Sequence, residues 1–308
     1  MKKVFFERAI FLNWYCSKQD CAFCYMSTLK GKVDKDKSRR TRASIFAEAL
    51  ICKKLNWKIE FLSGGYDALL KEEILDILKN IYSITKEKQW LNIGVLTKED
   101  LLLFEPYIKG VAGTVECINS SLREKLCPSK PLNEITEMFK ICDEFGLQKA
   151  MTIIIGLGET KNDIPKLLDF IKKYFVNRVT FYALKPQEGT IFKKGPTTKY
   201  YVEWIKRTRV AFPKLQIIAG TWSNRLGEVK DLLLSGADNI TKLPAIKILN
   251  SKKAKELVFQ VESANRTFES KFYNIPKIDW NNEIDKLFID ENLKDDIKKK
   301  MQYYTKSL

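Results

Sequence analysis

Three of the seven cysteines stand within nine residues near the start of the chain, at Cys16, Cys21 and Cys24. The sequence contains no histidine, so a transition-metal site here must use thiolates, carboxylates or the backbone. Thiolates select iron–sulfur clusters, zinc or Cu(I), and structural zinc or ordinary four-iron sites use four protein ligands. Three thiolates would leave one iron of a four-iron cluster open. The loop therefore predicts a cluster whose open iron binds a substrate directly.

Other interpretations of the loop stay open at this level. The three cysteines could be buried small apolar side chains, or a zinc knuckle completed by a carboxylate. A disulfide is disfavoured, because no secretory signal pattern is found and we expect a reducing cytoplasm. The remaining cysteines are widely spaced, which favours ordinary reduced side chains over a second cluster. They are Cys52, Cys117, Cys127 and Cys142.

The composition narrows the class of protein. The chain has 308 residues, of which 45% are hydrophobic, enough for a sizeable core. The formal charge of +16 comes from 54 Lys and Arg against 38 Asp and Glu. Such an excess suits nucleic acid, an anionic substrate or a Lys-rich organism. Nucleic-acid binding is disfavoured, because no RNA-binding aromatic motif and no basic block occurs. No apolar run reaches the length of a membrane span, so we expect no membrane association.

Short β-type runs alternate with longer helical stretches, which predicts βα units around a parallel sheet. Eight such repeats in about 250 residues fit a (β/α)8 TIM-type barrel, with an open doubly wound sheet as the competitor. We expect residues 1–250 to form the barrel and residues 251–308 a C-terminal helix and extension packed on it, or an interaction tail. The predicted strands cover residues 9–14, 57–62, 91–96, 110–117, 149–155, 178–184, 215–219 and 238–241. The predicted helices cover residues 44–55, with Ser44 as N-cap, and 68–82, 98–107, 131–145, 162–174, 200–212 and 226–234.

The loops at the C-terminal ends of barrel strands hold the catalytic groups of this fold. The cysteine loop follows the first predicted strand, and Ser63-Gly64-Gly65 follows the second. Paired glycines let a backbone approach a ligand closely, although in most loops they form only a turn. Glu116 ends the fourth strand, with Arg123 shortly after it. These loops should therefore surround one site.

The cysteine loop resembles the signature loop of radical S-adenosylmethionine (SAM) enzymes. In that superfamily three cysteines hold a [4Fe-4S] cluster, and the fourth iron chelates the amino and carboxylate groups of SAM. The usual spacing is three residues and then two, whereas this chain has four and then two. The resemblance makes Cys16, Cys21 and Cys24 the metal ligands. It also places Phe23 where the superfamily has an aromatic ring against adenine.

The same resemblance extends to the next strand ends. It implies that the backbone of Ser63-Gly64-Gly65 contacts the amino group of SAM. It implies that Glu116 contacts the ribose or that amino group; the alternative is an acid that stabilises a helix dipole. Arg123 would pair with the SAM carboxylate, unless it is a solvated surface arginine.

The later strands resemble the biotin synthase-like branch of the superfamily, through Gly156-Leu157-Gly158-Glu159-Thr160 and Leu184-Lys185-Pro186-Gln187. By this resemblance the backbone at Ile155 and Gly156 packs on adenine, and Leu184 belongs to the cofactor site. Tyr182, Lys185 and Gln187 would line the cavity.

Within that branch, Asn13-Trp14-Tyr15 before the cysteines and Tyr25-Met26 after them most resemble archaeal radical SAM proteins of [Fe]-hydrogenase cofactor biosynthesis. The implied activity is reductive cleavage of SAM to a 5′-deoxyadenosyl radical that takes hydrogen from a small molecule. A low-potential electron donor such as ferredoxin would be the partner. Two other functions stay open: a radical SAM enzyme that modifies tRNA or protein, and a non-catalytic cluster or zinc scaffold.

Overall fold

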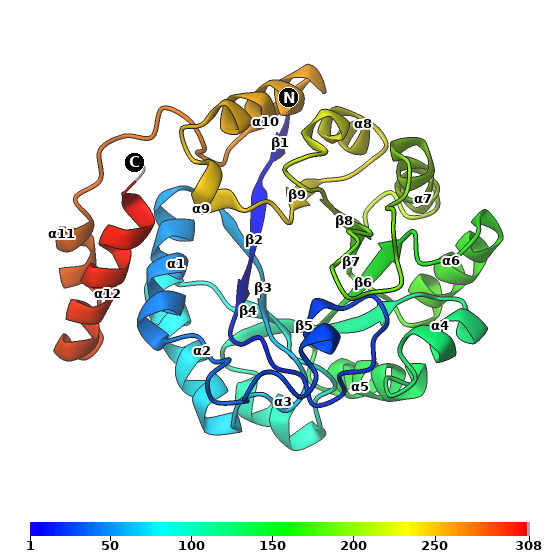
Figure 1. Ribbon diagram of the computed structural model, residues 1–308, viewed down its shortest axis with the longest axis horizontal. Coiled ribbons are helices and arrows are strands. Elements are labelled where there is room, and N and C mark those ends of the chain that lie inside the picture. The colour runs from blue at the N-terminus through cyan, green and yellow to red at the C-terminus, as the bar shows by residue number, and fades with distance from the viewer. Residues whose placement is uncertain (307–308) are drawn as a thin grey trace.

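The computed structural model describes residues 1–306, and its centre is a closed barrel of eight parallel strands (Figure 1). The strands follow one another around the barrel in chain order, and helices cover the outside. The predicted (β/α)8 barrel is thus confirmed, and the open doubly wound sheet is excluded. The barrel strands are β2 (Phe6–Phe11), β3 (Lys58–Ser63), β4 (Gln89–Asn92), β5 (Ile108–Glu116), β6 (Gln148–Ile155), β7 (Arg178–Ala183), β8 (Gln216–Gly220) and β9 (Asn239–Thr241).

The seven predicted helices lie close to their predicted positions, with shifts at the ends, whereas the short helices Ser120–Leu126 and Ala245–Ile248 were not predicted. Thr41, not Ser44, is the N-cap of the first helix, because the Thr41 hydroxyl accepts the hydrogen bond from the amide of Ser44. The connecting helices are α1 (Arg42–Lys54), α2 (Lys71–Thr85), α3 (Lys98–Phe104), α4 (Ser120–Leu126), α5 (Leu132–Glu144), α6 (Ile164–Lys173), α7 (Thr198–Ala211), α8 (Val229–Leu234) and α9 (Ala245–Ile248), with 3-10 turns η1 (Tyr25–Leu29), η2 (Lys161–Asp163) and η3 (Leu226–Glu228).

Two strands outside the barrel were not predicted. They are β1 (Lys2–Val4) and β10 (Arg266–Phe268), which pair in parallel as a separate two-stranded sheet. The first barrel strand accordingly begins at Phe6 rather than at residue 9. The start of the chain is thereby joined to a segment that follows the last barrel strand.

Polar side chains fill the barrel interior near the N-terminal ends of the strands. The guanidinium of Arg178 forms an ion pair with Glu7, with 3.0 Å between Nη1 and Oε2, and lies 5.1 Å from the centre of the Trp90 ring. Further along the strands, the buried Glu60 carboxylate accepts hydrogen bonds from the hydroxyls of Tyr182 and Thr241. These layers form the floor of any cavity at the C-terminal ends of the strands.

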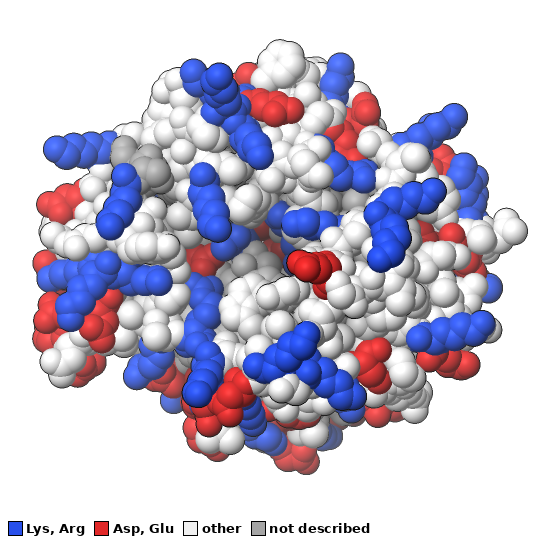
Figure 2. Space-filling model, viewed as in Figure 1, with Lys and Arg blue, Asp and Glu red and all other residues white. Residues whose placement is uncertain are grey.

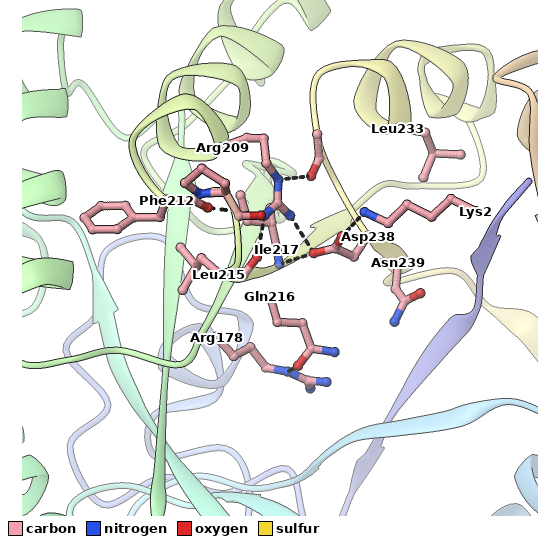
Figure 3. Close-up of polar contacts among 12 residues, drawn as sticks. Lys2, Arg178, Arg209, Phe212, Leu215, Gln216, Ile217, Leu233, Asp238 and Asn239 are labelled. Atoms are coloured by element: carbon pink, nitrogen blue, oxygen red, sulfur yellow. Dashed lines mark hydrogen bonds and ion pairs between the residues drawn. The ribbon is translucent and has the colours of Figure 1, made fainter.

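The guanidinium of Arg209 in α7 connects the two segments that lead into the barrel strands β8 and β9 (Figure 3). Its Nε donates to the carbonyl of Gly236 at 2.9 Å, and its Nη1 donates to the carbonyl of Leu215 at 2.7 Å. Its Nη2 pairs with Asp238 at 2.6 Å, and the same carboxylate accepts the amide of Ile217. One guanidinium thus fixes the segments that lead into β8 and β9.

The chain after β9 forms three further helices, α10 (Lys252–Ser263), α11 (Trp280–Asp285) and α12 (Glu291–Thr305). Helix α10 packs against α8, and α12 packs against α1 on the outside of the barrel (Figure 1). The short helix α9 follows the eighth barrel strand directly, and the longer helix α10 lies beyond residue 250, where a domain boundary stays a prediction. No helix among residues 1–306 is both long and apolar enough to cross a membrane.

Candidate active site

The cysteine loop connects β2 to η1 and is fixed by its neighbours on two sides. The amide of Ser17 donates to the carbonyl of Tyr66 at 3.0 Å, which joins the loop to the segment after β3. The amide of Ala22 donates to the carbonyl of Leu126 at 2.8 Å, and Asp20 accepts the amide of Ser129 at 3.0 Å. The three thiols are therefore positioned by main-chain contacts with the loops after β3 and β5.

The contact between the cysteine loop and the segment after β3 is tightest at Gly65. A β-carbon at this position would lie 2.0 Å from the carbonyl oxygen of Tyr15 and 2.6 Å from Cβ of Cys16. Only glycine allows so close an approach between the two loops. The Asn13 side chain adds to the junction, since its Oδ1 accepts the amides of Tyr15 and Gly65 at 3.1 and 3.3 Å. The paired glycines are thus part of the support for Cys16.

A cavity of about 240 Å³ lies at the C-terminal ends of the barrel strands, and we call it the cysteine cavity. It brings together most of the residues predicted from the sequence, which come from four separate segments of the chain. Those that line it are Cys16, Cys21, Phe23, Cys24, Ser63, Gly64, Gly65, Glu116 and Leu184, together with Tyr182, Lys185 and Gln187.

Three predicted residues do not line the cysteine cavity. Arg123 is buried, and its guanidinium donates to main-chain carbonyls, including that of Lys130 at 2.6 Å from Nη2. It holds the loop after α4 instead of meeting a ligand carboxylate. Ile155 packs in the core outside the barrel, and the neighbouring Ile154 lines the cavity in its place. The amide of Gly156 donates to Glu159 at 2.7 Å.

Sequence reasoning missed Lys130, whose amine is buried beside the cysteines. Its Nζ lies 4.0 Å from Oε1 of Glu116 and 6.0 Å from the ring centres of both Phe23 and Tyr66. Burial alone would lower the pKa of Lys130, but Glu116 and Cys21 nearby raise it. Lys130 therefore carries a positive charge next to the thiols. Its place after the Cys127-Pro128 turn gave no signal in the sequence.

The thiols of Cys21 and Cys24 are neutral in the protein alone. Burial raises the pKa of Cys21 to about 12, and Lys130 opposes this shift. Burial likewise raises the pKa of Cys24. Among residues 1–306, no three metal-ligating side chains converge on a single ion. A cube-shaped cluster binds each thiolate at a different iron, so its ligands surround a volume and need not meet at a point.

The donor set therefore fits a [4Fe-4S] cluster better than a single zinc ion. The three thiols border one cavity, and the chain has no histidine. The buried ammonium group of Lys130 can balance the negative charge of the thiolates. The same cavity is also lined by polar main chain at Ser63, Gly64 and Gly65 and by the Glu116 carboxylate. These groups suit a ligand that has amino and hydroxyl groups.

A second, larger cavity of about 1360 Å³ adjoins the first, and we call it the seam cavity. It shares Cys24, Lys185, Trp222 and Lys242 with the cysteine cavity and continues between β2, α1, α9 and α12. Figure 2 shows a hollow in this face of the molecule, with Lys and Arg side chains around it. Lys242 was also missed, although its place directly after the predicted strand 238–241 could have identified it.

Comparison with known proteins places the chain among enzymes with such a cysteine loop. The model of the radical SAM superfamily matches residues 15–171. The protein MJ0597 of Methanocaldococcus jannaschii is 41% identical over 276 residues, which is 88% of this chain and 76% of that protein. Biotin synthase of Methanococcus vannielii is 24% identical over 187 residues, and the match covers 60% of this chain and 56% of the synthase. The chain thus aligns with little more than half of that synthase.

The fold has a counterpart among solved structures. The crystal structure of methylornithine synthase (PylB) superimposes with a TM-score of 0.73 over 86% of this chain and 83% of that one. The sequence identity is 18%, so this likeness concerns the barrel alone.

Proposed function

Because this chain belongs to the radical SAM superfamily, we propose that Cys16, Cys21 and Cys24 hold a [4Fe-4S] cluster at which SAM is cleaved reductively. The cluster, when bound, would supply the electron that breaks the bond between sulfonium and ribose, yielding methionine and a 5′-deoxyadenosyl radical. The observation that supports this most directly is the cysteine cavity, which is lined by the three cysteines together with Ser63, Gly64, Gly65 and Glu116.

The roles of the surrounding residues follow from their chemistry. The Glu116 carboxylate, held near Lys130, would accept hydrogen bonds from the ribose or amino group of SAM. The backbone of Ser63, Gly64 and Gly65 would bind the amino group, and Phe23 and Leu184 would flank the adenine with apolar surface. Enclosure of the site keeps water away from a reactive radical. Arg123 is left out of this set, since its donors are used within the protein.

The finer proposal concerns the pathway. We propose that the enzyme acts on a small molecule in cofactor biosynthesis, at a step that forms the pyridinol part of the iron-guanylylpyridinol cofactor of [Fe]-hydrogenase. The segments around the cysteine loop, with Trp14, Tyr15, Tyr25 and Met26, support it by their resemblance to that subfamily. A low-potential donor such as ferredoxin would deliver the electron.

The test begins with anaerobic reconstitution of the protein with iron and sulfide. SAM and dithionite are then added, and 5′-deoxyadenosine is followed by chromatography. Wild type should form it, and Cys21→Ala should not. Cys142→Ala is the matched control, because Cys142 is buried in α5 away from the cavity. Intact SAM in a wild-type sample that has four irons per chain would contradict the proposed reaction.

A further inference from the structure

The seam cavity exists because the last barrel strand is short. Strand β9 has three residues and pairs with β2 only at Phe6 with Ile240 and Glu7 with Thr241. Strand β2 continues to Phe11, so its edge toward β9 has no strand partner beyond Glu7. The barrel wall opens there, and α12 closes the outer side with Lys300, Tyr303 and Tyr304. The opening is large enough for a substrate beside SAM.

The charged groups of the seam cavity are strongly unbalanced. It is lined by six cationic side chains and one carboxylate, that of Glu48. Glu48 is already used, since its two oxygens pair with Arg8 and Arg40. Both arginines also donate to main-chain carbonyls, those of Leu243 and Phe11. This leaves four lysines without an ion pair within residues 1–306: Lys185, Lys242, Lys247 and Lys300.

Lys242 is the lysine that borders both cavities. Its amine lies 5.2 Å from the ring centre of Phe11 and 4.9 Å from that of Tyr182. Aromatic faces attract an ammonium group but do not neutralise it. Its backbone has a φ of +73°, a left-handed conformation that costs a non-glycine residue free energy, so the surrounding structure must hold it in place. Burial lowers the pKa of Lys242, and the nearby carboxylates of Glu60 and Glu116 oppose this shift. The fold thus holds an amine that has no ion pair within residues 1–306 over the floor of the site.

Lys185, which follows β7, has a similar arrangement and also lines both cavities. Its amine lies 4.9 Å from the centre of the Trp222 ring, and the indole of Trp222 is fixed because its Nε1 donates to the carbonyl of Ala183 at 3.0 Å. Two ammonium groups therefore face one cavity from different strands, each resting on an aromatic ring. Such groups suit an oxyanion, which accepts strong charge-assisted hydrogen bonds.

We propose that the seam cavity binds the substrate and that Lys242, with Lys185, recognises an oxyanion of it, either a carboxylate or a phosphate. The aromatic rings of Phe11, Tyr182 and Trp222 would pack on its apolar part. This assignment rests on the proposed function and extends it to the chemical class of the substrate. It also gives α12 a role, because this helix forms the outer wall of the substrate site.

The test measures binding by anaerobic calorimetry on the reconstituted protein, with saturating SAM and no reductant. The probes are benzoate, phenyl phosphate and the neutral benzamide. Wild type should bind at least one of the two anions about tenfold more tightly than benzamide, equivalent to about 1.4 kcal/mol. The tighter anion identifies the group that the substrate carries. Equal affinity for benzamide and both anions would overturn the proposal.

Variants locate the binding group. Lys242→Met should lose about tenfold in anion affinity and keep its affinity for benzamide, whereas Lys242→Arg should retain the anion. Lys214→Met is the control, because Lys214 is exposed before β8 and lines neither cavity. An equal loss in Lys214→Met, or no loss in Lys242→Met, would contradict the assignment.

Two measurements keep the test independent of folding and of SAM cleavage. If Lys242→Met does not fold, Lys185→Met and the salt dependence of wild type replace it: benzoate affinity should fall with added salt, and benzamide affinity should not. Anion binding without 5′-deoxyadenosine formation would overturn the reaction and leave this site intact. Formation of 5′-deoxyadenosine without anion binding would overturn the site alone.

Discussion

Glu116 and Lys242 share an unusual backbone at the ends of two barrel strands. Glu116 has a φ of +59° and Lys242 a φ of +73°, both in the left-handed region. For residues that are not glycine this conformation costs about 1–3 kcal/mol, so the surrounding structure must hold it in place. In both cases the strained residue carries a charge and lines the cysteine cavity. Strain at these two positions thus coincides with the chemistry that we propose.

Gly65 gives the sharpest test at the scale of one residue. Gly65→Ala should separate the two loops, because the new β-carbon would meet the Tyr15 carbonyl and Cys16. We expect iron bound after reconstitution to fall by at least half, as measured by iron analysis per folded chain. Gly227→Ala is the control, since a β-carbon there has no neighbour within 4 Å. Full iron loading of Gly65→Ala would show that this junction does not position Cys16.

The sequence predicted which residues border the site better than it predicted where their side chains point. The cysteines were predicted from their type and spacing, and Glu116 and the paired glycines from the family resemblance of their segments at strand ends; the structure brings them to one cavity. Alternation within a continuous apolar run does not show which side chain faces inward, so the sequence did not indicate that the Ile154 side chain lines the cavity. Contact between adenine and the backbone at Ile155 and Gly156 stays a prediction. Arg123 was misplaced because its main-chain partners, such as the carbonyl of Lys130, are set by the tertiary fold.

At the scale of elements, the strands and helices followed from their alternation, whereas the pairing of β1 with β10 did not. Each of these strands has three residues, too few for a recognisable pattern, and their partners lie far apart in the sequence. Strand β4 also ends at Asn92 instead of residue 96. The chain turns at Gly94, whose φ is +110°, to bring its loop beside Tyr66.

The junction made by α7 can be tested through Arg209. Arg209→Met removes the donors for the carbonyls of Gly236 and Leu215 and leaves Asp238 without its guanidinium. We expect a loss of about 2–4 kcal/mol in the free energy of unfolding, measured with urea. Arg207→Met is the matched control from the same helix. Its guanidinium pairs with the neighbouring Glu203 on the surface, so its loss should stay below about 1 kcal/mol. Equal losses would contradict a special role for Arg209.

At the scale of the whole molecule, buried charged side chains fill the barrel near the N-terminal ends of its strands, and the cavities lie at the C-terminal ends. Arg178 and Glu7 are both buried, and Asn239 donates to the same carboxylate at 2.6 Å. Removing one partner of such a pair leaves a buried charge without compensation, which is strongly destabilising. The buried polar side chains therefore stabilise the barrel, while the cavities lie at the C-terminal ends of the strands.

Because some thiols are buried, the free energy of unfolding of the whole chain changes with pH in the alkaline range. Burial raises the pKa of Cys142 from 9.0 to about 12. Folding therefore favours the neutral thiol: its stabilising contribution is complete below pH 9.0 and is lost as the pH rises toward 12. We expect Cys142→Ala to lose less unfolding free energy than wild type over this window, by up to about 1.4 kcal/mol per pH unit.

The measurement is urea unfolding under reducing, anaerobic conditions at pH 7, 8, 10 and 11. Between the two lower values the difference between wild type and Cys142→Ala should be constant, which serves as the internal control. A constant difference up to the highest value would mean that Cys142 ionises as easily in the folded chain as in the unfolded one.

The pairing of the N-terminal segment has a consequence for synthesis of the protein. The strand that carries the cysteine loop has one barrel neighbour at residues 240–241, and the strand before it pairs with residues 266–268. At about 5–20 residues per second, these partners leave the ribosome roughly 12–50 seconds after the cysteines. Throughout that time the thiols belong to an unfinished barrel and are open to oxygen and stray metal ions. Insertion of the proposed cluster would therefore follow translation, and until then the thiols of the growing chain would have to be kept reduced.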